Sequence, residues 1–455
     1  MAKHEFDVVV VGAGPAGEVC AGRLADAGLE VAIVENDHIG GECSFFACMP
    51  SKALLRPAQA VDEARRIPGA AEAVSGQLDT GAVLERRDEV IHDLDDSGME
   101  PWLDDKGIAL YRGRGRLDGE RRVKIGHEVA VARRAVVIAT GSGSKVPPIP
   151  GLREAKPWSN REITTAKQAP PRLAVFGGGV VGVEMAQAWA TLGSAVSLIE
   201  AGDGLIGREE PFAGEQVADA LRGLGVDVRT GAKASAVSRE GGEVTIELEQ
   251  GEPVSADELL VAIGRFPHTD DLGLESAGLE PGESIEVEDT MRVPGSDWLY
   301  AIGDVNGRAL LTHMGKYQGR AAADQICGKD ALVTHDGAVS PRVIFTDPQV
   351  AAVGHTVASA EEAGLNVRAV ATGTSANAGG SFYGRDAPGT TQLVIDEDRR
   401  VLAGATFTGP DVADFLHAAT VAVVGEVPLD RLWHAVPSFP TRSEVWLNLL
   451  EDYGL

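Results

Sequence analysis

The sequence predicts an α/β fold built from two similar strand–helix–strand repeats and a separate C-terminal α+β domain. Three observations support this fold class. A glycine-rich turn follows a buried apolar strand near the N-terminus, and the same pattern recurs from Leu173. From Pro341 onward the composition changes to shorter strands alternating with helices. Apolar strands that alternate with helices are typical of parallel sheets, so we expect two such sheets and one further domain.

The first repeat begins with the apolar run Phe6–Val11, which predicts a strand buried on both faces. The turn Gly12-Ala13-Gly14-Pro15-Ala16-Gly17 then opens a helix that extends through Ala27. We expect Gly12 to permit the tight turn, Gly14 to let a pyrophosphate approach, and Gly17 to let helix and strand pack closely. The next strand ends at Glu35, 23 residues after Gly12, where a carboxylate that binds ribose hydroxyls is expected.

The second repeat has the same internal spacing. The strand Leu173–Phe176 precedes a glycine turn and a helix through Leu192, and the following strand ends at Glu200, again 23 residues after the first glycine. The predicted cofactor contacts here are Gly177, Gly179, Val180, Val181 and Gly182. Two such turns imply two dinucleotides, for example a bound flavin and a diffusible nicotinamide. Glu200 would bind a free 2′-hydroxyl and repel a 2′-phosphate, which favours NADH over NADPH.

A run from Gly40 to Lys52 carries two of the four cysteines, Cys43 and Cys48. The spacing predicts a redox-active pair on the first turns of a helix, where the dipole favours a thiolate. A regular helix would separate residues five apart by about 7.5 Å, more than a disulfide spans, so a bridge requires distorted backbone. Lys52, one turn beyond Cys48, can place an ammonium near sulfur and cofactor. Two buried structural cysteines are the alternative that the spacing leaves open.

The rest of the chain gives the expected domain boundaries. Residues 52–103 read as helical, interrupted at Pro57 and at Pro68-Gly69. A strand at 298–302 runs into Gly303-Asp304, where the carboxylate suits ribityl hydroxyls or, alternatively, caps the next helix. We expect a first cofactor domain at 1–150, a second at 151–285, a segment completing the first site at 286–338, and a C-terminal domain at 339–455.

Composition excludes several function classes. The formal net charge of −27 argues against nucleic acid and anionic membranes as partners. No apolar run has the length of a membrane span and no signal-peptide pattern precedes Phe6, so we expect a cytoplasmic protein. In that compartment a close cysteine pair is catalytic more often than structural. Cys20 and Cys327 are expected to be packing residues, and no metal site is predicted.

The chain resembles the pyridine nucleotide-disulfide oxidoreductases of the glutathione reductase and dihydrolipoamide dehydrogenase type. The resemblance covers nearly the whole chain and rests on motifs that together are highly specific. These are Gly12-x-Gly14-x-x-Gly17, Gly40-Gly41-x-Cys43-x4-Cys48-x-Pro50-Ser51-Lys52, Ala139-Thr140-Gly141, Gly177-x-Gly179-x-x-Gly182-x-Glu184, Ala262-Ile263-Gly264-Arg265, Ala301-Ile302-Gly303-Asp304 and Phe345-Thr346-Asp347-Pro348.

The resemblance implies a homodimer with FAD, NAD and dimerisation domains and with active sites at the subunit boundary. Cys48 would face the flavin, and Cys43 would exchange with substrate. Lys52 would lie near flavin N5, paired with Glu184. The other implied FAD contacts are Thr140, Gly141 and Asp304, with Gly115 and Thr312 through their backbones, and Gly264 would belong to the nucleotide sites.

The chain departs from the family in one place. Members that reduce small disulfides end in a His-Pro-x-x-x-Glu pattern, whose His is the acid/base for the substrate thiol and comes from the partner subunit. Here the run is Phe439-Pro440-Thr441-Arg442-Ser443-Glu444, so Phe439 stands where His belongs and Glu444 is retained. His434 is the nearest imidazole in the sequence. A missing general acid/base lowers the rate by roughly 10²–10⁴-fold.

Three functions are therefore weighed. The first is an NADH-dependent flavoprotein reductase that passes electrons to a small-molecule acceptor, quinone-like or otherwise without a disulfide; Phe439, with Phe45 and Phe46, would make the site's mouth apolar. The second is a disulfide reductase of the dihydrolipoamide dehydrogenase type, in which His434 or Glu444 replaces the missing His. The third is a flavin redox sensor with negligible turnover, which retention of both cysteines disfavours.

Overall fold

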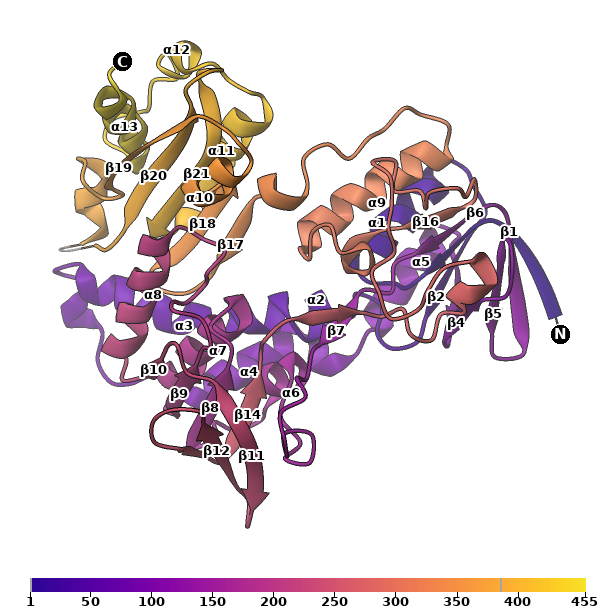
Figure 1. Ribbon diagram of the computed structural model, residues 1–455, viewed down its shortest axis with the longest axis horizontal. Coiled ribbons are helices and arrows are strands. Elements are labelled where there is room, and N and C mark those ends of the chain that lie inside the picture. Colours follow the sequence, from indigo (N-terminus) through magenta and orange to yellow (C-terminus); the bar gives the residue numbers. More distant parts are fainter. Residues whose placement is uncertain (1, 385–386) are drawn as a thin grey trace. The chain divides into compact units, whose positions relative to one another are not determined.

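The computed structural model describes residues 2–384 and 387–455. The chain forms two compact units (Figure 1). Unit 1 comprises the chain up to Pro50, Asp88–Lys145 and Gly264–Gly337. Unit 2 comprises Ser51–Arg87, Val146–Ile263 and Ala338–Leu455. The four domain ranges expected from the sequence stay predictions.

Unit 1 is organised around a mostly parallel sheet. Its strands are β1 (Ala2–Val11), β2 (Val31–Glu35), β3 (Ala109–Arg112), β6 (Glu128–Ile138), β16 (Leu299–Ala301), β4 (Gly115–Leu117) and β5 (Arg122–Ile125). The order is β3-β2-β1-β6-β5-β4, and β16 also pairs with β6. The central strand β1 is parallel to β2 and β6, and Val8 pairs with both Val31 and Ala135. Val8, Val9 and Val10 are fully buried, which confirms the strand predicted from the apolar run.

Two helices of unit 1, α1 (Pro15–Asp26) and α9 (Thr312–Ile326), lie side by side against this sheet (Figure 1). Small residues bring them into close contact. A Cβ atom added to Gly319 would lie 2.6 Å from the carbonyl oxygen of Ala16. One added to Gly315 would lie 3.2 Å from the Cβ of Ala16. Cys20 is fully buried in the same core and Cys327 packs against it, as expected of packing residues.

Shorter elements complete unit 1. They are α2 (Gly41–Phe45), the start of α3 (Cys48–Arg66), η2 (His92–Leu94), η3 (Ser97–Met99), α5 (Glu100–Asp105), η4 (Leu274–Ala277) and η5 (Gly303–Asn306). A two-stranded antiparallel ribbon pairs β7 (Ser142–Ser144) with β15 (Arg265–Pro267). This ribbon begins directly after the Ala139-Thr140-Gly141 segment, so it lies at the carboxyl end of β6.

Unit 2 contains the second parallel sheet, in the order β10-β9-β8-β14. Its strands are β8 (Arg172–Phe176), β9 (Ala195–Ile199), β10 (Asp227–Arg229) and β14 (Glu258–Val261), with a meander of β11 (Ala234–Glu240), β12 (Glu243–Leu248) and β13 (Val254–Ala256). Its helices are the rest of α3, α4 (Thr80–Val90), α6 (Asn160–Thr165), α7 (Val180–Thr191) and α8 (Pro211–Gly223), with η1 (Ala71–Ala73). Trp189 in α7 is fully buried at the core of this unit.

The expected interruption at Pro57 is wrong, because α3 continues through it to Arg66. A proline inside a helix costs about 3 kcal/mol or more. Here Leu54, Leu55 and Ala58 are at least 96% buried around it, and burying such side chains contributes about 1.5–3 kcal/mol for each leucine. Packing therefore outweighs the local cost. The interruption at Pro68 is confirmed, since no helix crosses it.

The C-terminal part of unit 2 is an antiparallel sheet in the order β17-β18-β21-β20-β19. Its elements are β17 (Arg342–Ile344), β18 (Gln349–Gly354), α10 (Val357–Glu362), β19 (Val367–Gly373), η7 (Gly379–Tyr383), β20 (Thr390–Asp396), β21 (Val401–Gly409), α11 (Val412–Val424), α12 (Leu429–Leu432), η8 (Arg442–Glu444) and α13 (Val445–Tyr453). The α+β composition predicted for this region is confirmed. Across the described part of the chain, every helix is too short or too polar to span a bilayer.

We predict that Gly319→Ala destabilises unit 1 by about 1–3 kcal/mol, because the added methyl meets the Ala16 carbonyl at the α1–α9 contact. Urea unfolding followed by circular dichroism measures this change. Gly98→Ala is the matched control, since Gly98 lies in η3 of the same unit and its added Cβ meets no atom within 4 Å. Equal stabilities for the two variants would contradict the prediction.

Candidate active site

The first glycine turn has the geometry expected for each of its glycines. Gly12 has φ +107°, and a Cβ there would lie 2.3 Å from the Ala139 carbonyl oxygen. A Cβ on Gly17 would lie 2.0 Å from the Gly12 carbonyl oxygen, so only glycine permits this contact. At Gly14, by contrast, an added Cβ meets no atom within 4 Å. The N-terminus of α1 is therefore open to an anion at Gly14.

The second glycine turn repeats this geometry in unit 2. Gly177 has φ +105° and its Cβ would lie 2.4 Å from the Ala262 carbonyl oxygen, while a Cβ on Gly182 would lie 1.8 Å from the Gly177 carbonyl oxygen. Gly179 is open, as Gly14 is. Val180 and Val181 form the exposed first turn of α7. Two open helix N-termini fit the pyrophosphates of two dinucleotides.

The predicted ribose carboxylates also occupy equivalent places. Glu35 accepts hydrogen bonds from the backbone N–H groups of Ala13 and Asp37, both at 2.7 Å. Glu200 accepts them from Gly178 and Gly202, both at 2.6 Å. Each carboxylate thus joins the end of the second strand to the glycine turn, and burial raises the pKa of Glu35. Their binding of ribose hydroxyls stays a prediction.

Asp304 lies at the beginning of η5, after Gly303 with φ +75°. Its Oδ2 accepts a hydrogen bond of 2.6 Å from the Ser142 hydroxyl. Arg265 donates to that hydroxyl at 2.7 Å and to the Ser142 carbonyl at 2.6 Å. No side chain caps η5, so the alternative interpretation of Asp304 as a helix cap is wrong. Sequence reasoning missed Ser142, although it directly follows the Thr140-Gly141 motif.

The remaining predicted backbone contacts lie at turns of unit 1. The Thr140 hydroxyl donates to the His268 carbonyl at 3.0 Å, and the Gly141 carbonyl accepts from the His268 N–H at 3.0 Å. Gly264 has φ +138° and its carbonyl accepts from Lys145. Gly115 begins β4, where a Cβ would lie 3.1 Å from Val11. These residues shape the carboxyl edge of the sheet, and their FAD contacts stay predictions.

The two cysteines lie on two helices rather than one. Gly40 and Gly41 turn the chain with φ of +105° and +56°, and Cys43 lies in the short α2. Phe46, with φ −132° and ψ 0°, ends α2, and Cys48 begins α3. The expected distortion between the cysteines is therefore confirmed. Both cysteines are thiols in this structure, and the bridge stays a prediction.

The thiols share a hydrogen-bond network with α9. The Cys43 thiol is hydrogen-bonded to Cys48 and to Thr312, and Thr312 Oγ1 lies 3.3 Å from Cys48 Sγ. The bond to Cys48, together with burial, raises the pKa of Cys43 well above its ordinary value, whereas Thr312 and Lys316 act in the opposite direction. Cys48 is the first residue of a 19-residue helix, a position that favours a thiolate. The pair can therefore hold its proton on Cys43 and its negative charge on Cys48.

The ion pair expected from the resemblance is present in unit 2. Lys52 Nζ lies 2.7 Å from Glu184 Oε2, and Glu184 Oε1 accepts from the Phe345 N–H at 2.9 Å. Lys52 also lies over the Phe345 ring, 4.6 Å from its centroid. Because the Glu184 side chain is buried, its charge needs this ammonium and this N–H. The place of Lys52 beside a flavin stays a prediction.

The expectation that Phe45, Phe46 and Phe439 make the entrance of the site apolar is wrong for the first two. Phe45 and Phe46 are buried against Ile91 and pack on the His38 ring at 4.9 and 5.4 Å between centroids. They are packing residues because α2 turns them away from solvent. Phe439, in contrast, is 76% exposed.

The other C-terminal candidates do not form a catalytic pair in the described chain. Glu444 belongs to η8, and its buried Oε2 has no hydrogen-bond partner within residues 2–384 and 387–455. His434 lies on the exposed turn after α12, and its N–H donates to the Arg431 carbonyl. Among the same described residues, no group of three His, Cys, Asp or Glu side chains could hold a metal ion.

Comparisons with known proteins agree with this geometry. The family model described as pyridine nucleotide-disulphide oxidoreductase matches residues 6–319, and the model of the corresponding dimerisation domain matches residues 340–450. The chain is 33% identical to a dihydrolipoyl dehydrogenase of Chlamydia muridarum, over 97% of this chain and 95% of that one. It is 32% identical to a mercuric reductase of Acidithiobacillus ferrooxidans, over 94% of this chain and 79% of the relative. The solved structure of the HOCl-induced flavoprotein disulfide reductase RclA from Escherichia coli has a TM-score of 0.85 at 25% identity, covering 98% and 99% of the two chains.

Sequence reasoning also missed a buried carboxyl group in the first turn of α1. Glu18 Oε1 has no hydrogen-bond partner in the described chain. Burial raises the pKa of Glu18 to about 7, Lys316 opposes that shift, and Glu35 adds to it. The signal in the sequence is a glutamate directly after the glycine turn, but its burial depends on α9.

We predict that Glu18 makes folding stability depend on pH. Its folded pKa is raised, so its stabilising contribution is complete below the unfolded value near 4.5 and is lost as pH rises through about 7. Glu18→Gln should be more stable than the wild type at pH 8, by roughly 2–3 kcal/mol, and should differ much less at pH 5. Urea unfolding at both pH values measures this. Asp105→Asn, at an exposed position of α5, is the control and should follow the wild type.

Proposed function

Because the chain belongs to the pyridine nucleotide-disulphide oxidoreductase family, we propose that it is an enzyme that oxidises NADH and reduces a quinone-like or other non-disulfide acceptor. The family is FAD-dependent, and its members are oxidoreductases. The observation that carries the choice of acceptor is Phe439. It is 76% exposed at the position where the resemblance expects a histidine, and no histidine occurs in residues 435–444.

The missing imidazole bears on the two classes of acceptor differently. Reducing a disulfide releases a thiolate, which needs a nearby acid to leave as a thiol, and losing that acid lowers the rate by roughly 10²–10⁴-fold. A flat quinone ring accepts electrons without a thiol intermediate. An exposed phenyl ring also offers it an apolar surface, whereas an imidazole would be polar. The proposed acceptor therefore suits the side chain that is present.

The other residues have defined tasks in this proposal. FAD, when bound, supplies hydride acceptance from NADH and onward electron transfer. Lys52, held by Glu184 at 2.7 Å, keeps a fixed positive charge. Cys43 keeps the thiol proton and leaves Cys48, which Thr312 contacts through its hydroxyl, as the site of negative charge. Glu200 sets the preference for NADH through a charge that repels a 2′-phosphate.

Two further features belong to the proposal. The dimerisation domain matched at residues 340–450 supports a homodimer. The charge of −27 supports a freely diffusing protein with a small-molecule acceptor, and we propose the cytoplasm as its location. A redox sensor without turnover would fail to oxidise NADH in the assays below.

A disulfide reductase is the second candidate, and the thiol geometry favours it. Cys43, Cys48 and Thr312 form one hydrogen-bonded group, so the two thiols lie close together, as exchange between a dithiol and a disulfide requires. Glu444 has a buried carboxylate oxygen without a partner in the described chain and is one candidate for the missing acid/base. His434 is the other, on an exposed turn. The comparison with a dihydrolipoyl dehydrogenase supports the same candidate.

Steady-state oxidation of NADH by the holoenzyme separates the two functions. We expect rapid reduction of a benzoquinone, at a rate that Cys43→Ser changes by less than about threefold. We expect lipoamide reduction to be at least about 100-fold slower than benzoquinone reduction, because the general acid is missing. Rapid lipoamide turnover that Cys43→Ser abolishes would refute the quinone proposal and support the disulfide reductase. Cys327→Ser is the control, because this cysteine packs at the end of α9, away from Thr312, and should change neither rate.

Nucleotide preference gives an independent prediction. Glu200→Gln removes the charge and keeps the length of the side chain. Its single amide oxygen can accept from only one of the Gly178 and Gly202 N–H groups, which bind different oxygens of Glu200. We expect the ratio of kcat/KM for NADPH to that for NADH to rise at least about tenfold, equivalent to about 1.4 kcal/mol. Glu243→Gln, which only alters an exposed ion pair with Arg172, is the control. An unchanged ratio would show that Glu200 does not select the nucleotide.

A further inference from the structure

A buried hydrogen-bond relay lies behind the Gly303–Asp304 turn. Gln318, in the middle of α9, is fully buried. Its Oε1 accepts from the Gly303 N–H at 2.8 Å and from Asn306 Nδ2 at 2.9 Å. Asn306 also donates to the Ala301 carbonyl at 3.1 Å, at the end of β16. One amide of α9 thus holds both ends of η5.

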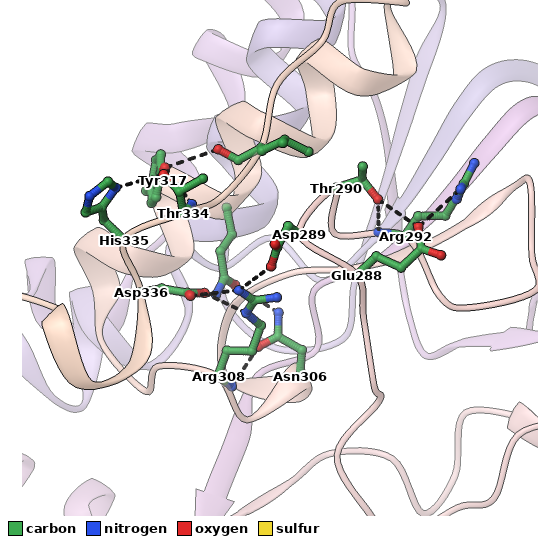
Figure 2. A network of polar contacts seen from close by, with 12 residues as sticks. Glu288, Asp289, Thr290, Arg292, Asn306, Arg308, Tyr317, Thr334, His335 and Asp336 are labelled. Carbon is green, nitrogen blue, oxygen red and sulfur yellow. Dashed lines mark hydrogen bonds and ion pairs between the residues drawn. The ribbon is translucent and has the colours of Figure 1, made fainter. Parts of the chain in front are cut away.

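The same amide connects the turn to a charged cluster. Gln318 Nε2 donates to Asp336 Oδ2 at 3.2 Å. Arg308 binds both oxygens of Asp336 at 2.8 Å and reaches Asp289 at 2.9 Å, and its N–H donates to Asn306 Oδ1 at 3.0 Å. Figure 2 shows Arg308 between Asp289 and Asp336, with Asn306 beside it. The side chain of Asp336 is only 7% exposed, so its bonds to Gln318 and Arg308 are screened less than those of an exposed carboxylate, whereas Asp289 is 60% exposed.

The groups on either side of Gln318 fix which end of its amide donates and which accepts. The Gly303 N–H can only donate and the Asp336 carboxylate can only accept, so the Gln318 oxygen must face the turn and its NH₂ must face Asp336. The orientation of Gln318 is therefore set from both sides. The turn itself has little freedom, because Gly303 packs against α1, where an added Cβ would lie 3.2 Å from that of Ala16.

We propose that Gln318, oriented by Asp336 and Arg308, is a positioning residue that holds the Gly303–Asp304 turn in the geometry that binds FAD. The inference rests on the proposed function, in which Asp304 binds the flavin's ribityl hydroxyls. Gln318 acts on FAD through the backbone of Gly303, while Ser142 and Arg265 hold the Asp304 carboxylate from the other side. A displaced turn would weaken FAD binding without removing any group that contacts FAD.

The test replaces the NH₂ donor of Gln318 by an acceptor and then supplies a donor at position 336. Gln318→Glu keeps the acceptor for Gly303 but sets a carboxylate against Asp336, so we expect FAD to leave the holoenzyme at least about tenfold faster. Asp336→Asn alone keeps an oxygen for Gln318 but gives up one of the two bonds that Arg308 donates to Asp336, and should change the rate by less than about threefold. The double variant Gln318→Glu/Asp336→Asn supplies an amide donor to the new carboxylate, again with one bond to Arg308 lost, and should return the rate to within about threefold of the wild type. Exchange of bound FAD for isotopically labelled FAD measures all four rates.

Tyr317→Phe is the matched control. Tyr317, adjacent on α9, bonds through its hydroxyl to the Leu332 carbonyl and the Thr334 N–H, both at 3.3 Å, and so holds the segment that leads to Asp336 without reaching the turn. It should leave FAD exchange unchanged even where it lowers the melting temperature.

Three outcomes would overturn the inference: wild-type exchange in Gln318→Glu, absence of rescue in the double variant, or equally fast exchange in Tyr317→Phe. Failure of the proposed function is distinguishable, because then the wild-type holoenzyme would itself retain FAD but fail to pass electrons from NADH to a quinone.

Discussion

The structure depends on one constraint, the close approach of each glycine turn to the strand and helix around it. A Cβ on Gly17 or Gly182 would lie at most 2.0 Å from a carbonyl oxygen of the same turn, and Gly12 and Gly177 have left-handed backbone that glycine adopts without strain. These contacts direct the N-termini of α1 and α7 at open space beside Gly14 and Gly179. Everything that makes the chain a dinucleotide-binding protein follows from that direction.

The second organising element is α9, which joins three parts of unit 1. Its first residue, Thr312, bonds to the thiol pair; Gly319 packs on α1; and Gln318 holds the turn that carries Asp304. A helix is rigid over this length, so these contacts keep fixed distances from one another. The thiols, the first glycine turn and the Gly303–Asp304 turn are thus all positioned by one helix.

The departure from the motifs that the resemblance implies lies near the end of the chain, at Phe439. The thiols, the Lys52–Glu184 pair and both glycine turns keep the geometry that the resemblance implies, whereas the position expected to hold an imidazole has an exposed phenyl ring. Glu444 retains its place, and its buried Oε2 has no hydrogen-bond partner in the described chain.

The sequence by itself determined the strands that flank the two glycine turns, the turns themselves and the distorted backbone between Cys43 and Cys48, because each depends on local geometry and on spacing along the chain. It also located the Lys52–Glu184 pair, through the resemblance. Only the tertiary structure decided that α3 continues through Pro57, that Phe45 and Phe46 are buried, and that Asp304 bonds to Ser142 rather than capping a helix. The burial of Glu18 and the relay through Gln318 likewise arise from side chains of distant segments that meet at α9. Packing and desolvation depend on which segments meet in space, and no local pattern contains that information.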